Sequence, residues 1–184
     1  FDLEIVTGRH RKDAAMHYAV YSESVRNLGT PVFPRRLFQE VLGEFQDSTD
    51  ILLVMNRGMA VAAVLTLYWR GVAYPYWGGG THTARALRAN DRMYFALMGH
   101  ARARGMEMFD FGRSKLGSGQ AAWKKSFGFE PVPLAYHGWS PHGAARRWHW
   151  SALTCQSWAR CRAIRRLAGW AKGIWSAKSM PLTA

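Results

Sequence analysis

The spacing of apolar residues divides the first half of the chain into two helices and four strands. We predict a short strand over 1–8 and, from helical spacing of apolar positions, a helix over 12–27. Pro34 suits the first turn of a second helix, which runs to Phe45. Three apolar runs separated by short turns then predict an antiparallel meander of strands over 51–55, 59–69 and 72–77.

The second half alternates helices with strands. A helix is predicted to begin at Asn90 or Asp91, either of which can cap it, and to end before Gly105. We then predict a strand over 106–111, a Gly-rich loop over 112–119, a helix over 120–127 and a strand over 131–136. A right-handed crossover would make the strand at 106–111 parallel to the strand at 72–77. The predicted fold is therefore α/β, with a mixed, mostly antiparallel sheet and helices on both faces.

Charge separates a globular body at 1–137 from a tail at 138–184. The chain has a formal net charge of +13, but the tail holds eight of the 25 basic residues and none of the 12 acidic ones. The body is thus only mildly basic, and the overall charge is poor evidence for nucleic-acid binding. Two interpretations of the tail remain open: a basic amphipathic segment over 159–178 that binds tRNA or an anionic membrane, or a non-native sequence produced by a reading-frame shift.

The residue types present exclude several classes of protein. At 48% hydrophobic residues the chain can bury a core, and it has no apolar run of 18 residues that would span a membrane. The two cysteines, Cys155 and Cys161, form neither a disulfide framework nor a metal site, and the histidines show no metal-ligand spacing. We therefore expect no metal and no permanently bound cofactor. The chain begins at Phe1 rather than Met, so we expect it to be a fragment of a longer protein.

One stretch, at 108–131, combines residues suited to binding an anionic ligand. A predicted strand ends in Asp110-Phe111-Gly112, glycines in the following loop permit close approach of a ligand, and the next helix carries Lys124 and Lys125. Free N–H groups at the start of that helix can bind a phosphate or a carboxylate. Because ligands bind where neighbouring strands diverge, we expect the loops over 78–83 and 112–119 to line the site.

Several motifs in this region resemble the Fem family of peptidyltransferases, whose domains are variants of the GNAT acyltransferase fold. The motifs are Asn90-Asp91 at a helix start, Phe109-Asp110-Phe111-Gly112, and Trp123-Lys124-Lys125-Ser126-Phe127-Gly128. The FemAB-related subgroup associated with PEP-CTERM/exosortase systems is closer still. The segments that resemble this subgroup are Ser24-Val25-Arg26-Asn27-Leu28-Gly29-Thr30-Pro31, Tyr76-Trp77-Gly78-Gly79-Gly80 and Phe109-Asp110-Phe111-Gly112-Arg113-Ser114-Lys115.

The resemblance implies a GNAT-like fold and transfer of an acyl or aminoacyl group to an amine in bacterial cell-envelope or exopolysaccharide assembly. Fem ligases use two such domains, so the resemblance implies a further N-terminal GNAT-like domain as partner. It also implies a location on the cytoplasmic side, with contact to the inner membrane surface as an option. The donor stays open between aminoacyl-tRNA and acyl-CoA, because the Gln/Arg-x-x-Gly-x-Gly/Ala pattern of ordinary GNAT enzymes is not found before the helix at Asn90.

The expected site residues fall into two groups. The resemblance assigns a catalytic role to Lys124, and Asp110 is placed to accept a proton or orient the amine. The expected substrate-binding residues are Arg26, Asn27, Tyr76, Gly78, Gly79, Gly80, Arg113, Ser114 and Lys115. Each has an ordinary structural alternative: a solvated helix lysine for Lys124, and a carboxylate that bonds backbone amides for Asp110. The alternative function is a non-catalytic GNAT-like scaffold that binds tRNA, membrane or an assembly partner.

Overall fold

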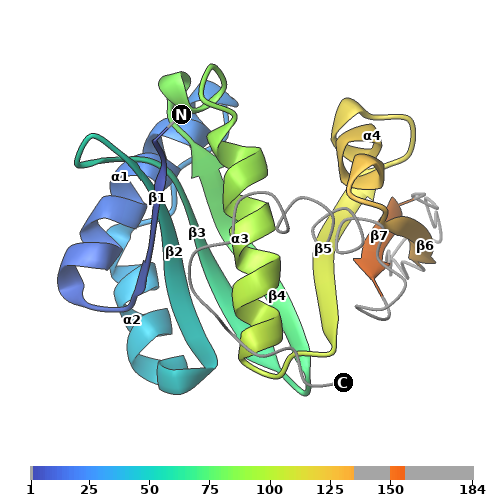
Figure 1. Ribbon diagram of the computed structural model, residues 1–184, viewed down its shortest axis with the longest axis horizontal. Coiled ribbons are helices and arrows are strands. Elements are labelled where there is room, and N and C mark those ends of the chain that lie inside the picture. The colour runs from blue at the N-terminus through green and yellow to red at the C-terminus, as the bar shows by residue number, and fades with distance from the viewer. Residues whose placement is uncertain (1, 135–149, 156–184) are drawn as a thin grey trace, which may run out of the picture. The chain divides into compact units, whose positions relative to one another are not determined.

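The computed structural model describes residues 2–134 and 150–155 and divides into two compact units, 1–112 and 113–184. In the first unit the strands lie in the order β1-β2-β3-β4-β5 (Figure 1). Its elements are β1 (Glu4–Gly8), α1 (Arg11–Asn27), α2 (Arg35–Phe45), β2 (Thr49–Asn56), β3 (Met59–Trp69), β4 (Val72–Gly80), α3 (Ala89–Ala103) and the first part of β5 (Met108–Lys115).

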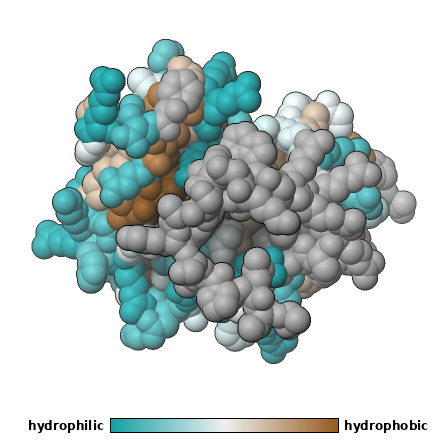
Figure 2. Space-filling view, in the orientation of Figure 1, coloured by the Kyte–Doolittle hydropathy of each residue, from teal (hydrophilic) through white to brown (hydrophobic). Residues whose placement is uncertain are grey.

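Alternating side chains of the central strands supply a core on each face of the sheet. On one face, side chains of β2 and β3 pack under α1 and α2 in a cluster of Val20, Tyr21, Phe38, Ile51, Leu53, Ala63 and Leu65. On the other face, α3 contacts β2, β3 and β4 and buries Met93, Leu97, Met98 and Ala101. In Figure 2 the described surface of this unit is mostly hydrophilic, with a hydrophobic band over β1 and β2. The predicted α/β architecture with helices on both faces is confirmed.

The topology follows the sequence prediction. β1 to β4 pair antiparallel in chain order. β4 and β5 pair in parallel through Val72–Met108 and Ala73–Phe109, as the crossover rule predicts. The strand predicted over 59–69 has the bounds of β3.

Three boundaries were predicted wrongly. Two of them are ends of strands, because local sequence patterns do not show how far a strand extends along its neighbour. Gly78–Gly80 are not a loop but the end of β4, paired with Ala62–Val64 of β3. The predicted loop over 112–119 is shortened, because β5 extends to Lys115. A sheet ladder is made by backbone groups, so glycine takes part in it even though its strand propensity is low.

Helix α3 also begins earlier than predicted. Its first residue is Ala89, and the N-cap position is held by Arg88 in a left-handed conformation rather than by Asn90 or Asp91. Asn90 lies within the first turn, where its side chain contacts Gly80.

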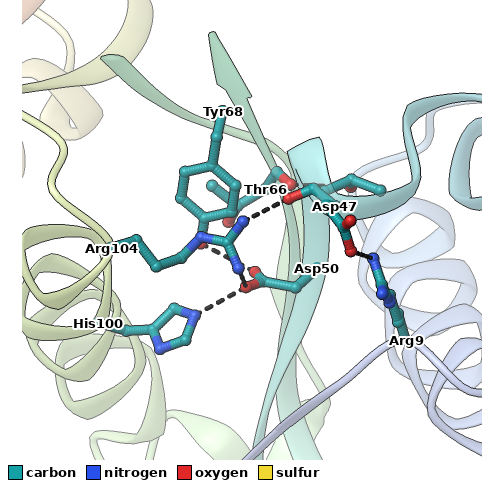
Figure 3. Close-up of polar contacts among 8 residues, drawn as sticks. Arg9, Asp47, Asp50, Thr66, Tyr68, His100 and Arg104 are labelled. Carbon is teal, nitrogen blue, oxygen red and sulfur yellow. Dashed lines mark hydrogen bonds and ion pairs between the residues drawn. The ribbon is translucent and has the colours of Figure 1, made fainter. Parts of the chain in front are cut away.

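A buried polar cluster anchors the C-terminal half of α3 to the sheet (Figure 3). Asp50 accepts hydrogen bonds from Tyr68 Oη at 2.8 Å and from His100 Nε2 at 2.7 Å, and Arg104 lies 3.3 Å from the same carboxylate. The Arg104 guanidinium also stacks over the Tyr68 ring at 4.3 Å. Burial, together with the neighbouring Asp50 charge, raises the pKa of Tyr68 above its usual range, so its hydroxyl stays a donor.

The second unit contains α4 (Gly119–Ser126), β6 (Glu130–Leu134) and β7 (Trp150–Cys155). β6 and β7 pair antiparallel from Glu130–Thr154 to Leu134–Trp150. The strand predicted over 131–136 corresponds to β6. The amphipathic segment predicted over 159–178 lies outside the described residues, and the domain boundary predicted after residue 137 stays a prediction. Among the described residues no helix has both the length and the apolar character needed to cross a membrane.

Candidate functional site

In the first unit, the edge of β4 that faces away from β3 continues beyond its ladder with β5, and we call this stretch of edge the opening. In the described part of the chain the parallel ladder consists of the pairs at Val72 and Ala73, although both strands continue well beyond them. From Tyr74 onward, the edge of β4 directed toward β5 is therefore not part of this ladder. An unpaired strand edge offers backbone N–H and C=O groups to a ligand, and a divergence between neighbouring strands is a usual place for one.

A β-bulge in β4 marks the start of this opening. Leu65 of β3 pairs with Trp77 and Thr66 pairs with Pro75, so Tyr76 is the extra residue. Bulges bend a strand and redirect side chains, and Pro75 next to the bulge has no N–H to contribute. Tyr76 is 64% exposed, whereas the Trp77 ring packs edge-on against Phe38. Tyr76 is thus the more exposed of the two aromatic residues, and its contact with substrate stays a prediction.

The three glycines that follow the bulge present backbone groups to the opening. Thr81 N–H donates to Val61 O of β3 at 2.8 Å. Because alternate residues of an antiparallel strand direct their N–H groups to opposite sides, Gly79 faces β3, whereas Gly78 and Gly80 face the opening. Two N–H groups aimed at one space can bind a carbonyl oxygen or an oxyanion.

These glycines also allow neighbouring elements to approach β4 closely. A Cβ atom on Gly79 would lie 2.6 Å from Ser24 Cβ of α1. A Cβ on Gly80 would lie 2.6 Å from Ala84 Cβ, and one on Gly78 would lie 2.9 Å from Val64 Cγ2. Close packing thus accounts for the missing side chains, and contact of these glycines with substrate stays a prediction.

His17 of α1 is a buried residue at this site that the sequence analysis missed. Its Nε2 lies 2.7 Å from Trp77 O, and its ring stacks on Tyr21 and meets Phe38 edge-on. A carbonyl can only accept, so Nε2 carries the proton and Nδ1 does not. Burial lowers the pKa of His17 to about 4, which keeps the imidazole neutral. The sequence analysis considered the histidines only as metal ligands.

The segment between β4 and α3 brings arginines to the start of α3. Arg85 and Arg88 are exposed, and Arg88 has φ of +50°. Glu23 of α1 accepts a hydrogen bond from His82 N–H at 2.8 Å and so fixes the start of this segment. The first N–H groups of a helix and nearby guanidinium groups together attract phosphates. The sequence analysis missed both arginines because it searched here for glycines.

Asp110 is engaged with its own strand. Its Oδ1 accepts a hydrogen bond from Gly112 N–H at 2.7 Å, and Gly112 has φ of +70°, a conformation that favours glycine. Phe109 and Phe111 are buried, and the Phe111 ring packs 4.7 Å from the Tyr94 ring of α3. The ordinary structural role of Asp110 is thus present. The second carboxylate oxygen does not take part in this hydrogen bond, and the role of Asp110 in proton transfer stays a prediction.

Arg26 and Asn27 lie at the end of α1, and both are exposed. Arg26 Nε donates to Ser22 O one turn earlier at 3.1 Å, so it stabilises the last turn of its own helix. A role of these two residues in substrate binding stays a prediction.

The remaining expected site residues belong to the second unit. Lys124 of α4 is only 5% exposed, and its Nζ donates to Arg113 O at 3.3 Å. It is therefore not the solvated helix lysine of the structural alternative. Ser114 is buried, whereas Arg113 and Lys115 are exposed. Ser118 caps α4 by accepting a hydrogen bond from Ala121 N–H at 3.2 Å.

Tyr76 and Gly78–Gly80 thus lie on one stretch of β4, His17 contacts the Trp77 carbonyl of the same stretch, and Arg85 and Arg88 lie in the segment that leads from β4 to α3. Lys124, Arg113 and Ser114 lie together in the second unit. The joint site of Asp110 and Lys124 stays a prediction.

Comparison with solved structures identifies the fold. Ribosomal-protein-S18-alanine N-acetyltransferase from Escherichia coli is 13% identical, with a TM-score of 0.63 over 83% of this chain and 92% of that chain. Ribosomal-protein-alanine N-acetyltransferase from Brucella melitensis is 17% identical, with a TM-score of 0.62 over 83% and 98%. An acetyltransferase from Bacillus subtilis solved in complex with CoA is 10% identical, with a TM-score of 0.57 over 83% and 97%. At these identities the similarity establishes the GNAT fold alone.

Comparison of sequences identifies the family. No curated protein sequence matches the chain significantly. The family model described as acetyltransferase (GNAT) domain matches residues 2–125, which include β1 to β5 and most of α4. The chain therefore belongs to the GNAT acetyltransferase domain family.

Proposed function

We propose that this chain transfers an acyl group from a coenzyme A thioester to an amine. The observation that carries the proposal is the open edge of β4, where the N–H groups of Gly78 and Gly80 point away from β3. In the reaction the amine nitrogen attacks the thioester carbonyl, the C–N bond forms, the C–S bond breaks and the amine proton passes to the thiolate. N–H groups that are already oriented stabilise the oxyanion formed on the way.

The segment before α3 supports coenzyme A as the carrier. Aligned on Arg85, the GNAT pattern Gln/Arg-x-x-Gly-x-Gly/Ala places its first glycine at Arg88 and its last small residue at Asn90. Arg88 has φ of +50°, so the backbone takes the left-handed conformation that glycine favours. Arg88 thus has a backbone conformation suited to the glycine that the pattern has at this position, and it adds a positive charge suited to a pyrophosphate.

A second candidate is aminoacyl transfer from aminoacyl-tRNA, as in Fem ligases. It is favoured by the Fem-like motifs Phe109–Gly112 and Trp123–Gly128 and by the burial of Lys124. In this candidate Lys124 binds the donor or stabilises the oxyanion, and Asp110 orients the amine. The acceptor would belong to cell-envelope or exopolysaccharide assembly. A GNAT-like N-terminal domain, tRNA and the inner membrane surface would be the partners.

Calorimetric titration with acetyl-CoA and with a charged tRNA distinguishes the two donors. We expect acetyl-CoA to bind and Arg85→Gln to weaken binding, whereas Arg36→Gln on α2, which also removes an exposed arginine, should not. Transfer is then assayed by release of free thiol with several amines. These include a peptide with an N-terminal alanine, because two similar structures are alanine N-acetyltransferases. Binding of charged tRNA without binding of acetyl-CoA would reject the first candidate.

Lys124 is tested with its neighbour as a control. Lys124→Met should lower the transfer rate if Lys124 takes part in catalysis, whereas Lys125→Met changes an exposed lysine one position away and should not. Full activity of a folded Lys124→Met variant would remove Lys124 from the site. Binding of neither donor would favour the alternative that the chain is a non-catalytic scaffold.

A further inference from the structure

The hydrogen bond of His17 acts on a peptide group that faces the site. Its acceptor is the Trp77 carbonyl, which belongs to the same planar peptide group as Gly78 N–H. In a trans peptide the C=O and N–H groups point in opposite directions. A donor that fixes the Trp77 carbonyl therefore fixes the direction of Gly78 N–H, which the strand alternation directs away from β3.

This part of β4 needs such a restraint. The Trp77–Gly78 peptide lies between the bulge at Tyr76 and two more glycines, Gly79 and Gly80. A bulge disrupts the regular ladder, and glycine permits peptide orientations that other residues exclude. Pairing with β3 holds one side of this segment, and the hydrogen bond from His17 adds a second restraint at the peptide that follows the bulge.

His17 is well suited to supply the contact. It is fully buried, stacked on Tyr21 and placed edge-on to Phe38, so its ring has little freedom to move. Among the described residues its Nδ1 has no hydrogen-bond partner. A buried histidine with one nitrogen unused is a costly way to fill a core position, which a leucine would fill more simply. Within the described part of the chain, the hydrogen bond that its ring makes is the one to Trp77 O.

We propose that His17 is a positioning residue that holds the Trp77–Gly78 peptide so that Gly78 N–H points at the carbonyl oxygen of the bound acyl group. The proposal rests on the proposed acyl transfer. His17 itself touches neither substrate nor the reacting atoms. It is part of α1, so this helix supports the site from the side of the sheet opposite α3.

The first test uses the unaltered protein. Long-range ¹H–¹⁵N spectra of the imidazole report which nitrogen is protonated. We expect the Nε2–H tautomer for His17, since only this form can donate to Trp77 O. Observation of the Nδ1–H tautomer would overturn the proposal without any variant having to fold.

The second test compares His17→Gln, which keeps an N–H donor at a similar reach, with His17→Met, which has similar bulk and no donor. Tyr21→Phe on the same helix controls for general loss of stability. The amide order parameter of Gly78 should be about 0.85 in the unaltered protein and in His17→Gln. It should fall below about 0.6 in His17→Met. An unchanged order parameter in His17→Met would overturn the proposal.

The catalytic consequence is measured with acetyl-CoA and an accepted amine. We expect His17→Met to lower kcat about tenfold or more with little change in KM for acetyl-CoA, because an oxyanion donor acts in the transition state. His17→Gln should restore most of the loss. If the unaltered protein does not bind acetyl-CoA, the proposed function fails. The tautomer and the order parameters then decide the role of His17 by themselves.

Discussion

The buried neutral histidine predicts a specific dependence of stability on pH. The pKa of His17 is lowered from 6.5 to about 4 in the folded protein by burial. Between these two values the unfolded chain binds a proton at this position and the folded chain does not. The free energy of unfolding therefore rises with pH across this window. As the pH falls through the window, the contribution of the neutral His17 to stability is lost. The rings packed on the imidazole belong to Tyr21 and Phe38, neither of which supplies an opposing charge.

The magnitude follows from the shift. A displacement of about 2.5 pKa units, from 6.5 to about 4, corresponds to about 3 kcal/mol between neutral pH and pH 4. At pH 5, where the fold is easier to study, most of this effect is already present, at about 2 kcal/mol. This is a large part of the stability of a small domain.

Urea unfolding at pH 7.5 and at pH 5 measures the effect in the unaltered protein and in His17→Gln. Other groups that titrate in this range contribute to both proteins, so the difference between their pH dependences isolates His17. We expect the unaltered protein to lose about 2 kcal/mol more than His17→Gln. Parallel pH dependences would show that His17 is accessible to a proton in the folded state and would refute the assignment of a buried neutral imidazole.

Further predictions concern packing, backbone strain and the cluster around Asp50. Gly79→Ala should destabilise the protein by about 1–3 kcal/mol in urea unfolding, and Ser24→Gly, which removes the clashing atoms, should restore most of it. Arg88→Gly should be more stable than Arg88→Ala by about 1 kcal/mol, because both lose the charge but only glycine relieves the left-handed φ; equal melting temperatures would contradict this. Asp50→Ala should lower the free energy of unfolding by about 3 kcal/mol or more, and Tyr68→Phe should lower it by only about 1 kcal/mol. The reverse order would show that Asp50 is not the main anchor of α3.

The fold was predictable because its signals are local and repeated. Apolar runs, helical spacing and Gly-containing turns each recur along the body, so an error at one boundary does not change the architecture. The crossover that makes β4 and β5 parallel follows from the order of elements alone. The errors occurred at Gly78–Gly80, at the end of β5 and at the start of α3. At these places local sequence patterns do not show how far a strand extends or where a helix begins.

The candidate site was only partly predictable, because much of it consists of backbone groups. The Gly78 and Gly80 residues were named, but the direction of their N–H groups depends on the register with β3 and on the bulge at Tyr76. Arg88 was missed because a conformation typical of glycine is held there by another residue. His17 was missed because a histidine on an apolar helix face has no sequence pattern that separates a core role from a positioning role.

The direction of the N–H groups on β4 and the role of His17 have a common physical cause. A site that stabilises charge with backbone N–H groups requires that the strand be bent, that neighbouring elements approach it closely and that single peptide groups be fixed. In this chain the Tyr76 bulge provides the bend, Gly79 allows Ser24 of α1 to approach, and His17 fixes the Trp77–Gly78 peptide. Two of these contacts come from α1, at positions 17 and 24, which are two helical turns apart and face the same strand. A substitution on this face of α1 should therefore alter catalysis although the residue does not contact substrate. An equally destabilising substitution in the Asp50 cluster, at the C-terminal end of α3, should lower stability alone.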